Sequence, residues 1–151
     1  FVAPVMIGKD HPLYSVNDVY NGILVKGNML GTSMFYGCGA GKLPTASAVV
    51  ADIIEALNNQ GQHVELGWDR ENLTISSMSS SSFRYFVRIK GIADKRVKEV
   101  EAVFGKVDVV ELDHMDEFAV LTETMTEEEY EIKAKKLPGI RQRIRAELVT
   151  V

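Results

Sequence analysis

The stretch Phe83-Arg84-Tyr85-Phe86-Val87-Arg88-Ile89-Lys90 decides the fold expected for the second half of this chain. Its odd positions are apolar and most of its even positions are basic, so the period of two predicts a half-buried strand. Beyond it, residues 94–104 carry apolar side chains at helical spacing. Residues 107–112 and 118–122 are short apolar runs typical of strands.

The remaining elements of this half follow in a regular order. Thr126 and Glu129 form a capping box at the start of a predicted helix, which stops at Pro138-Gly139. In the last predicted strand Ile144 and Ala146 alternate with arginines. The order βαββαβ predicts an α+β, ferredoxin-like unit with both helices on one face. We expect the other face to show Phe86 among Arg84, Arg88, Lys90, Arg141, Arg143 and Arg145.

Charged residues are concentrated in this second half. Residues 83–151 contain thirteen Lys or Arg and fourteen acids, whereas residues 1–60 contain three and four. Between them, residues 61–82 end in the tract Ser76-Ser77-Met78-Ser79-Ser80-Ser81-Ser82, which cannot bury apolar surface. We therefore expect two domains, residues 1–60 and 83–151, joined by a linker over residues 61–82.

Length and composition limit the class of protein. The 151 residues are 46% hydrophobic and 25% charged, as in ordinary globular chains, and no apolar run reaches the ~18 residues of a membrane span. The first residues lack the pattern of a signal peptide, and the single Cys38 cannot form an internal disulfide, so a cytoplasmic location is expected. The net charge of −4 argues against general nucleic-acid binding.

The first sixty residues predict a strand, a hairpin, a glycine-rich turn and a helix. Residues 2–7 form a short apolar run, and residues 17–26 and 29–36 flank Gly27-Asn28 as hairpin strands. The turn is Gly37-Cys38-Gly39-Ala40-Gly41, and Pro44 suits the first turn of the helix that follows. This helix is predicted to end at residues 58–61.

The glycine-rich turn has two interpretations. Three glycines in five residues allow a ligand to approach the backbone, and a helix N-terminus attracts anions. Alternatively, the glycines only supply a tight turn with positive φ. A dinucleotide fingerprint does not fit, since the turn follows a hairpin, and a Walker loop does not fit, since Leu43 follows Lys42.

Other polar residues predict no chemistry. Lys9-Asp10-His11 next to Pro12 indicates a solvated turn, and His114 lies in a polar loop without a ligand-spaced partner. We therefore assign no catalytic and no metal-binding residue.

The ordered blocks of the first sixty residues resemble the end of the catalytic region of homoserine dehydrogenase. The blocks are Lys9 to Leu13, Val16 to Asn21, Met34 to Gly41 and Pro44 to Asp52. The resemblance implies a fragment of an oxidoreductase that interconverts L-aspartate 4-semialdehyde and L-homoserine with NAD(P), in threonine, methionine and isoleucine biosynthesis. It places the last glycine of the turn, Gly41, at the nicotinamide, with Gly39 beside it, and Cys38 stands where the family usually has proline.

The same resemblance implies that most of the reaction belongs to parts absent from this sequence. The family's Rossmann domain and the stretch with its substrate-binding acids and catalytic lysine have no counterpart here. We therefore expect the chain alone to be inactive. The alternative is a free-standing amino-acid-sensing or interaction module without catalysis.

The unit at residues 83–151 resembles an ACT domain, the amino-acid-sensing module of many homoserine dehydrogenases. The resemblance implies an effector site at the first strand-to-helix loop, with Gly91 and Asp94 as its residues. Arg96 stands where the family has Pro-Gly, so we expect a weak or lost effector response, and we expect a homo-oligomer. An RNA-recognition sheet shares this topology, but its aromatic signature is absent here.

Overall fold

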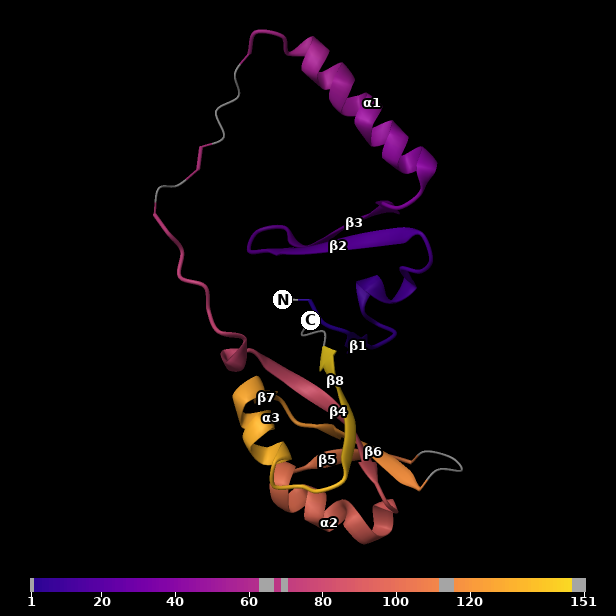
Figure 1. Ribbon diagram of the computed structural model, residues 1–151, viewed down its shortest axis with the longest axis vertical. Coiled ribbons are helices and arrows are strands. Elements are labelled where there is room, and N and C mark those ends of the chain that lie inside the picture. Colours follow the sequence, from indigo (N-terminus) through magenta and orange to yellow (C-terminus); the bar gives the residue numbers. More distant parts are fainter. Residues whose placement is uncertain (1, 63–66, 69–70, 112–115, 148–151) are drawn as a thin grey trace. The chain divides into compact units, whose positions relative to one another are not determined.

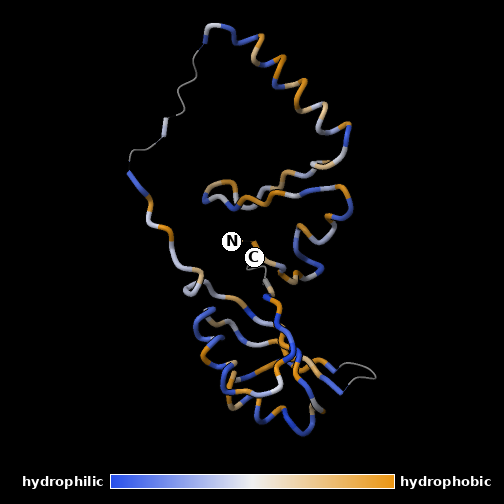
Figure 2. Tube along the Cα trace, in the orientation of Figure 1, coloured by the Kyte–Doolittle hydropathy of each residue, from blue (hydrophilic) through white to orange (hydrophobic). Residues whose placement is uncertain are grey.

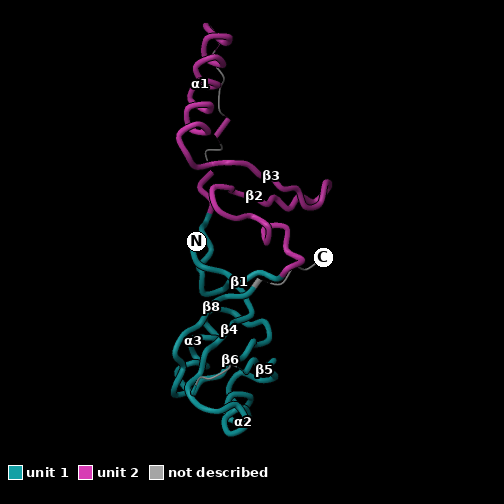
Figure 3. Tube along the Cα trace, turned by 90° about the vertical axis from the view of Figure 1, so that its right-hand side faces the viewer, with its two compact units in different colours: residues 1–8, 74–151 teal, residues 9–73 magenta. Residues whose placement is uncertain are grey.

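The computed structural model describes residues 2–62, 67–68, 71–111 and 116–147. The chain divides into two compact units, unit 1 with residues 1–8 and 74–151 and unit 2 with residues 9–73 (Figures 1 and 3). This division differs from the expected boundaries at residues 60 and 83. The first strand and the serine tract both belong to unit 1, so that unit 2 is inserted between two parts of unit 1.

Unit 1 is built on a mixed sheet. Its strand order is β1-β8-β4-β6-β5, and only the β1–β8 pair is parallel. The two-residue strand β7, Met125–Thr126, pairs with the start of β4. The five main strands are β1 Val5–Ile7, β4 Ser82–Lys90, β5 Val107–Glu111, β6 Glu117–Thr122 and β8 Ile140–Glu147.

Two helices lie on one face of this sheet and complete the core. Helix α2, Ala93–Phe104, and helix α3, Glu127–Ala134, follow β4 and β7 along the chain (Figure 1). The buried cluster joins Tyr85, Val87 and Ile89 of β4 to residues of both helices, namely Val100, Phe104 and Tyr130. The capping box of α3 is confirmed: Thr126 Oγ1 accepts from the Glu129 amide (3.1 Å), and Glu129 Oε2 accepts from the Thr126 amide (3.0 Å).

The expectation that Arg143 and Arg145 of the last strand lie on the helix-free face is wrong. In the β4–β8 register, Tyr85 pairs with Arg145 and Val87 with Arg143, so these arginines share the face that the helices cover. Both reach Glu127 at the start of α3, at 2.6 and 2.8 Å. The ion pairs with Glu127 stabilise Arg143 and Arg145 on the side of the helices. Ile144 and Ala146, which alternate with these arginines, therefore lie on the helix-free face.

The expected linker is partly structured. Residues Met78–Ser80 form a 3-10 helix (η2), which the side chain of Ser77 caps by accepting from the Ser79 amide at 3.2 Å. The backbone amide of Glu127 donates to Ser81 O at 3.0 Å, so the serine tract is joined to the start of α3. The tract lacks apolar bulk, but its hydroxyls and backbone satisfy hydrogen bonds there.

Unit 2 has the expected hairpin and helix. Strands β2, Tyr20–Gly27, and β3, Gly31–Cys38, pair antiparallel, and the 3-10 helix η1, Pro12–Ser15, precedes them. Helix α1, Lys42–Asn58, begins two residues before Pro44, which lies in its first turn as predicted. No described helix of the chain combines the length and apolar character that a membrane crossing requires.

Almost nothing in unit 2 is buried. His11 is the one buried residue among its described residues, so the turn expected to be solvated is partly covered. Ile23 and Phe35 are 65% and 66% exposed, and they pair on one face of the hairpin. Met34 and Tyr36, on the opposite face, are also exposed. A strand that is apolar on both faces is typical of the interior of a larger sheet.

Candidate functional site

The glycine-rich turn ends at the N-terminus of α1. Gly41 is the N-cap residue and has φ 114°, a conformation that L side chains rarely adopt. No side chain caps this helix end, and Thr45 Oγ1 donates to Gly41 O at 2.9 Å. The first intrahelical bond is donated by the Thr45 amide, and Pro44 has no N–H. The amides of Lys42 and Leu43 therefore precede the first helical bond and have no acceptor within the helix.

Gly39 lies close to a side chain of the hairpin. A Cβ atom at this position would run into the side-chain amide of Asn21 on β2, so a larger residue would displace that amide. The structure thus brings the two predicted cofactor residues into one turn, where Gly41 supplies the backbone conformation and Gly39 the space. Amides without a helical acceptor and the positive end of the helix dipole fit a polar or anionic group of a ligand such as a nicotinamide cofactor.

Side chains around this turn are aromatic and exposed. Tyr20 stacks on Tyr36 with ring centroids 4.9 Å apart, and it pairs across the hairpin with Cys38. The Coulombic interaction and hydrogen bond with Cys38 raise the pKa of Tyr20. His11 Nδ1 accepts from the Leu13 amide at 3.1 Å, so this histidine caps η1.

The two predicted effector residues line one groove of unit 1. Gly91 and Asp94 lie beside Glu111 and Glu117 around an open volume of about 250 Å³ at the start of α2. Gly91 has φ 114° and its amide donates to Asp116 O at 3.0 Å. The loop conformation therefore requires glycine here whether or not a ligand binds.

Arg96 covers the other side of this loop. Its guanidinium donates to Lys90 O at 2.7 Å and to Pro138 O at 2.8 Å. It also pairs with Glu99 at 2.9 Å. A Cβ at Gly91 would lie 3.0 Å from Arg96 Cδ. The arginine thus fills the space beside the glycine and ties the loop after β4 to the loop before β8.

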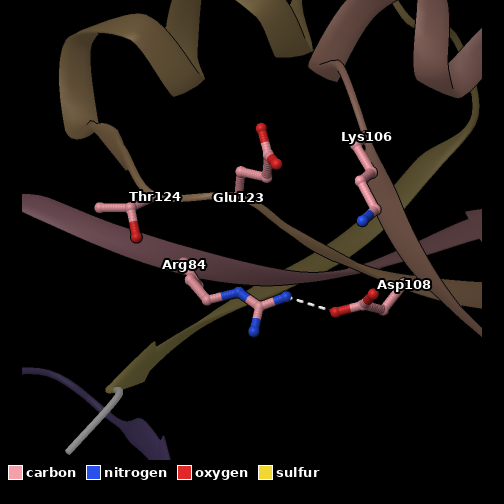
Figure 4. A pocket seen from close by; sticks show the side chains of 5 residues that line it. All are labelled: Arg84, Lys106, Asp108, Glu123 and Thr124. Atoms are coloured by element: carbon pink, nitrogen blue, oxygen red, sulfur yellow. Dashed lines mark hydrogen bonds and ion pairs between the residues drawn. The ribbon is translucent and has the colours of Figure 1, made fainter. Parts of the chain in front are cut away.

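A second groove of unit 1 was not predicted. It has a volume of about 400 Å³ and is lined by Arg84, Lys106, Asp108, Glu123 and Thr124 (Figure 4). Arg84 donates to Asp108 Oδ2 at 2.5 Å and to Thr122 O at 2.6 Å. Its residues come from three strands or their ends and share no spacing along the chain, so no sequence pattern could have indicated it.

A carboxylate network lies between α3 and β8. Glu127 accepts from Arg143, Arg145 and the Tyr85 hydroxyl. Burial alone would raise the pKa of Glu127, but these three hydrogen bonds outweigh it and lower the pKa to about 2. Burial raises the pKa of Tyr130 to about 12, and the Arg143 guanidinium lies 4.7 Å from the centre of that ring. Glu127 binds both arginines, and Arg143 also lies over the Tyr130 ring, although Arg143 Nη1 is buried without a hydrogen-bond partner among the described residues. These contacts indicate a structural role.

Metal ligands do not converge in the part of the chain that the structure describes. Within it, no group of three His, Cys, Asp or Glu residues has an arrangement that would hold a metal ion. His114 lies outside the described residues.

Comparison with known proteins gives one consistent family. Residues 1–54 match the family model for homoserine dehydrogenase. A homoserine dehydrogenase of Synechocystis sp. is 44% identical over 93 residues, which are 62% of this chain and 20% of the relative. The homoserine dehydrogenase of Mycobacterium bovis is 36% identical over 112 residues, which are 72% of this chain and 25% of that protein.

Solved structures agree with this result. A Staphylococcus aureus homoserine dehydrogenase superposes with a TM-score of 0.65 at 30% identity, over 97% of this chain and 36% of that one. A homoserine dehydrogenase from Thiobacillus denitrificans superposes with a TM-score of 0.74 over 96% of this chain and 38% of that one. At 23% sequence identity, this superposition indicates a shared fold alone.

The matches agree on a class of protein, an oxidoreductase. The family is homoserine dehydrogenase, and the resemblance predicted from the sequence is confirmed: the chain corresponds to part of a homoserine dehydrogenase. It spans about a fifth to a quarter of the length of the curated relatives described above. The alternative of a free-standing module without catalysis is not favoured.

Proposed function

We propose that this chain serves a homoserine dehydrogenase that interconverts L-aspartate 4-semialdehyde and L-homoserine with NAD(P) in the cytoplasm, as part of threonine, methionine and isoleucine biosynthesis. The observation that carries the proposal is the match of residues 1–54 to the family, which includes the whole glycine turn. The exposed apolar faces of the hairpin and of α1 support it, since they need a larger sheet to cover them. The hydride-transfer residues belong to the remainder of such an enzyme.

Gly41 and Gly39 are the proposed cofactor contacts. The cofactor, when bound, accepts the hydride, and this chain contributes backbone groups of the glycine turn that contact the cofactor. The positive φ of Gly41 favours glycine, which has no Cβ at the start of α1. The amides of Lys42 and Leu43, which have no helical acceptor, can then bind a polar edge of the nicotinamide.

Residues 83–151 are proposed to act as an ACT-like regulatory domain of ferredoxin-like type. The strand order β8-β4-β6-β5 and the two helices on one face support this assignment. Gly91 and Asp94 are the proposed effector residues, since both line the groove at the start of α2. Arg96, bound to two backbone carbonyls beside Gly91, favours a weak response.

A chimera tests the proposal. The segment of the Staphylococcus aureus homoserine dehydrogenase that this chain matches is replaced by residues 1–151, and reduction of NAD(P) by homoserine is followed. We expect turnover in the chimera and none with the 151-residue chain alone, which lacks the hydride-transfer residues. A soluble, folded chimera without activity would contradict the proposal, as would protein-dependent turnover by the chain alone.

The role of Gly41 is tested in the same chimera. Gly41→Val adds bulk where the cofactor approaches, so the cofactor KM should rise or kcat should fall, with a loss of about tenfold or more in kcat/KM. Gly31→Val is the matched control, since Gly31 also has a positive φ (75°) but is the first residue of β3, at the end of the hairpin turn. Equal losses in both variants would leave only the conformational interpretation of Gly41.

A further inference from the structure

Asn21 lies beside the glycine-rich turn on one face of the β2–β3 hairpin. It is the second residue of β2 and pairs across the hairpin with Gly37. Because paired residues and every second residue share a face, its side chain lies on the side of Ile23 and Phe35. A Cβ atom at Gly39 would overlap Asn21 Nδ2, so the side-chain amide of Asn21 packs directly on the turn.

The side-chain amide of Asn21 has unused hydrogen-bonding capacity. Among the described residues, its one hydrogen bond runs from Nδ2 to Val19 O at 3.5 Å, which is long for an N–H···O bond. A carboxamide has two N–H donors and a carbonyl acceptor. Oδ1 and one N–H of Asn21 are therefore available to a ligand, and the residue is exposed.

The packing of the chain itself does not explain the glycine opposite Asn21. Gly37 lies within β3 and has no positive φ, so its backbone conformation does not require glycine. A Cβ atom at Gly37 would meet no atom within 4 Å. A glycine inside a strand often marks a place where a ligand or another backbone approaches closely. Gly37 and Gly39 thus form a floor without side chains beside the amide of Asn21.

We propose that Asn21 binds the carboxamide group of the nicotinamide, an inference that rests on the proposed function, in which the same turn contacts the cofactor. The carboxamide of a nicotinamide carries an amino group that donates and a carbonyl oxygen that accepts, and the amide of Asn21 offers the complementary acceptor and donor. Two hydrogen bonds between the two amides orient the ring beside the floor of Gly37 and Gly39. Asn21 is then a specificity-determining contact of the cofactor.

The lack of charge at this position favours the carboxamide over the other groups of the reactants. Phosphates and carboxylates are bound most strongly by arginine and lysine side chains. Among the described residues, no hydrogen bond joins the side chain of Asn21 to a charged group. A neutral group that both donates and accepts matches an amide better than an anion.

The experiment compares two dinucleotides in the chimera described above. The acetylpyridine analogue of the cofactor has a methyl group in place of the amino group of the carboxamide, so it keeps the acceptor and loses the donor. Calorimetry measures the binding of each reduced dinucleotide without turnover. The native chimera should bind the nicotinamide form about three- to tenfold more tightly, as expected for one hydrogen bond. Asn21→Ala should weaken binding of the nicotinamide form about tenfold and abolish this preference.

Two further variants separate recognition from a general disturbance of unit 2. Asn21→Asp keeps the acceptor and loses the donor, so it should bind both dinucleotides more weakly but retain the preference for the nicotinamide form. Asn17→Ala is the matched control, because Asn17 is also exposed and also bonds locally, from Nδ2 to Ser15 O at 3.2 Å, outside the glycine turn. It should bind both dinucleotides as the native chimera does. Circular dichroism shows that each variant is folded.

Several results would overturn the inference and leave the proposed function intact. These are an active native chimera that binds both dinucleotides equally, an Asn21→Ala chimera that keeps the preference, and equal losses in Asn21→Ala and Asn17→Ala. A loss in Asn21→Ala that is confined to the KM of homoserine would assign Asn21 to the substrate instead. A folded chimera that neither binds a dinucleotide nor turns over would contradict the proposed function and this inference together.

Discussion

Units 1 and 2 differ in whether they hold their own core. In unit 1 the buried cluster of twelve apolar residues joins four strands and both helices. In unit 2 the 17-residue helix α1 has no buried residue, and its apolar positions, orange in Figure 2, are half or more exposed. The difference indicates that α1 depends for its stability on contacts to its apolar face that the described residues of unit 2 do not supply, because an isolated helix is only marginally stable in water.

Hydrogen exchange should show the largest difference between the two units. In the 151-residue chain, the amides of β4 should exchange at least about a thousandfold more slowly than those of α1, because β4 opens only with the unit 1 core. The measurement is exchange followed by mass spectrometry, with the chimera as control, in which α1 should become protected. Equal protection of α1 and β4 in the chain alone would show that unit 2 is as stable as unit 1.

Truncation of an apolar side chain should lower the free energy of unfolding by several kcal/mol more in unit 1 than in unit 2. Phe118→Ala removes a side chain that is 2% exposed in the unit 1 core and should cost about 3–5 kcal/mol of unfolding free energy. Ile53→Ala on α1 removes a side chain that is 55% exposed and should cost about 0.5 kcal/mol or less. Urea unfolding followed by far-ultraviolet circular dichroism measures the free energy of unfolding of both variants. A loss of several kcal/mol in Ile53→Ala would show that Ile53 packs in a core of unit 2.

The sequence predicts local elements well because their signals are local. The capping box at Thr126, the helix after the glycine turn and the hairpin around residues 27–31 all lie where the pattern indicates. The cofactor residues Gly41 and Gly39 also fall in one turn, although ligand binding there stays a prediction. These features depend on hydrogen bonds and dihedral angles within a few residues.

The features that were predicted wrongly depend on distant residues. The alternation in β8 has the correct period, but its phase is set by Glu127, which lies 16 and 18 residues from Arg143 and Arg145. Strand β1 looks like part of the first sixty residues, yet it pairs with β8, about 140 residues later in the chain. Neither contact leaves a mark in the local sequence.

The Glu127 network should make unit 1 less stable in acid. The folded pKa of about 2 lies below the ordinary value of 4.5, so the stabilisation is fully present above about pH 4.5 and is lost as the pH falls towards 2. Two and a half pKa units correspond to about 3 kcal/mol at most. Urea unfolding at several pH values should show native chain and Glu127→Gln differing most at pH 7 and converging near pH 2.

Glu128→Gln is the matched control for this network. Glu128 stands in the same first turn of α3 and is exposed, so its substitution changes the helix charge without touching Arg143 or Arg145. Its unfolding free energy should follow that of the native chain at every pH. A pH dependence that Glu127→Gln leaves unchanged would assign the acid sensitivity to other carboxylates.

A smaller effect than that of Glu127 is expected at Arg96, which joins two loops of unit 1 and fills the space beside Gly91. Arg96→Ala removes the hydrogen bonds to Lys90 O and Pro138 O and should cost about 1–2 kcal/mol. Arg96→Lys should recover only part of this loss, because a single ammonium cannot match the two-pronged geometry of the guanidinium. Calorimetric titration of the native chain with threonine, methionine, isoleucine and lysine should give no micromolar binding, since the arginine already occupies the loop. Micromolar binding of any of these amino acids by the native chain would show that the loop accepts an effector with Arg96 in place.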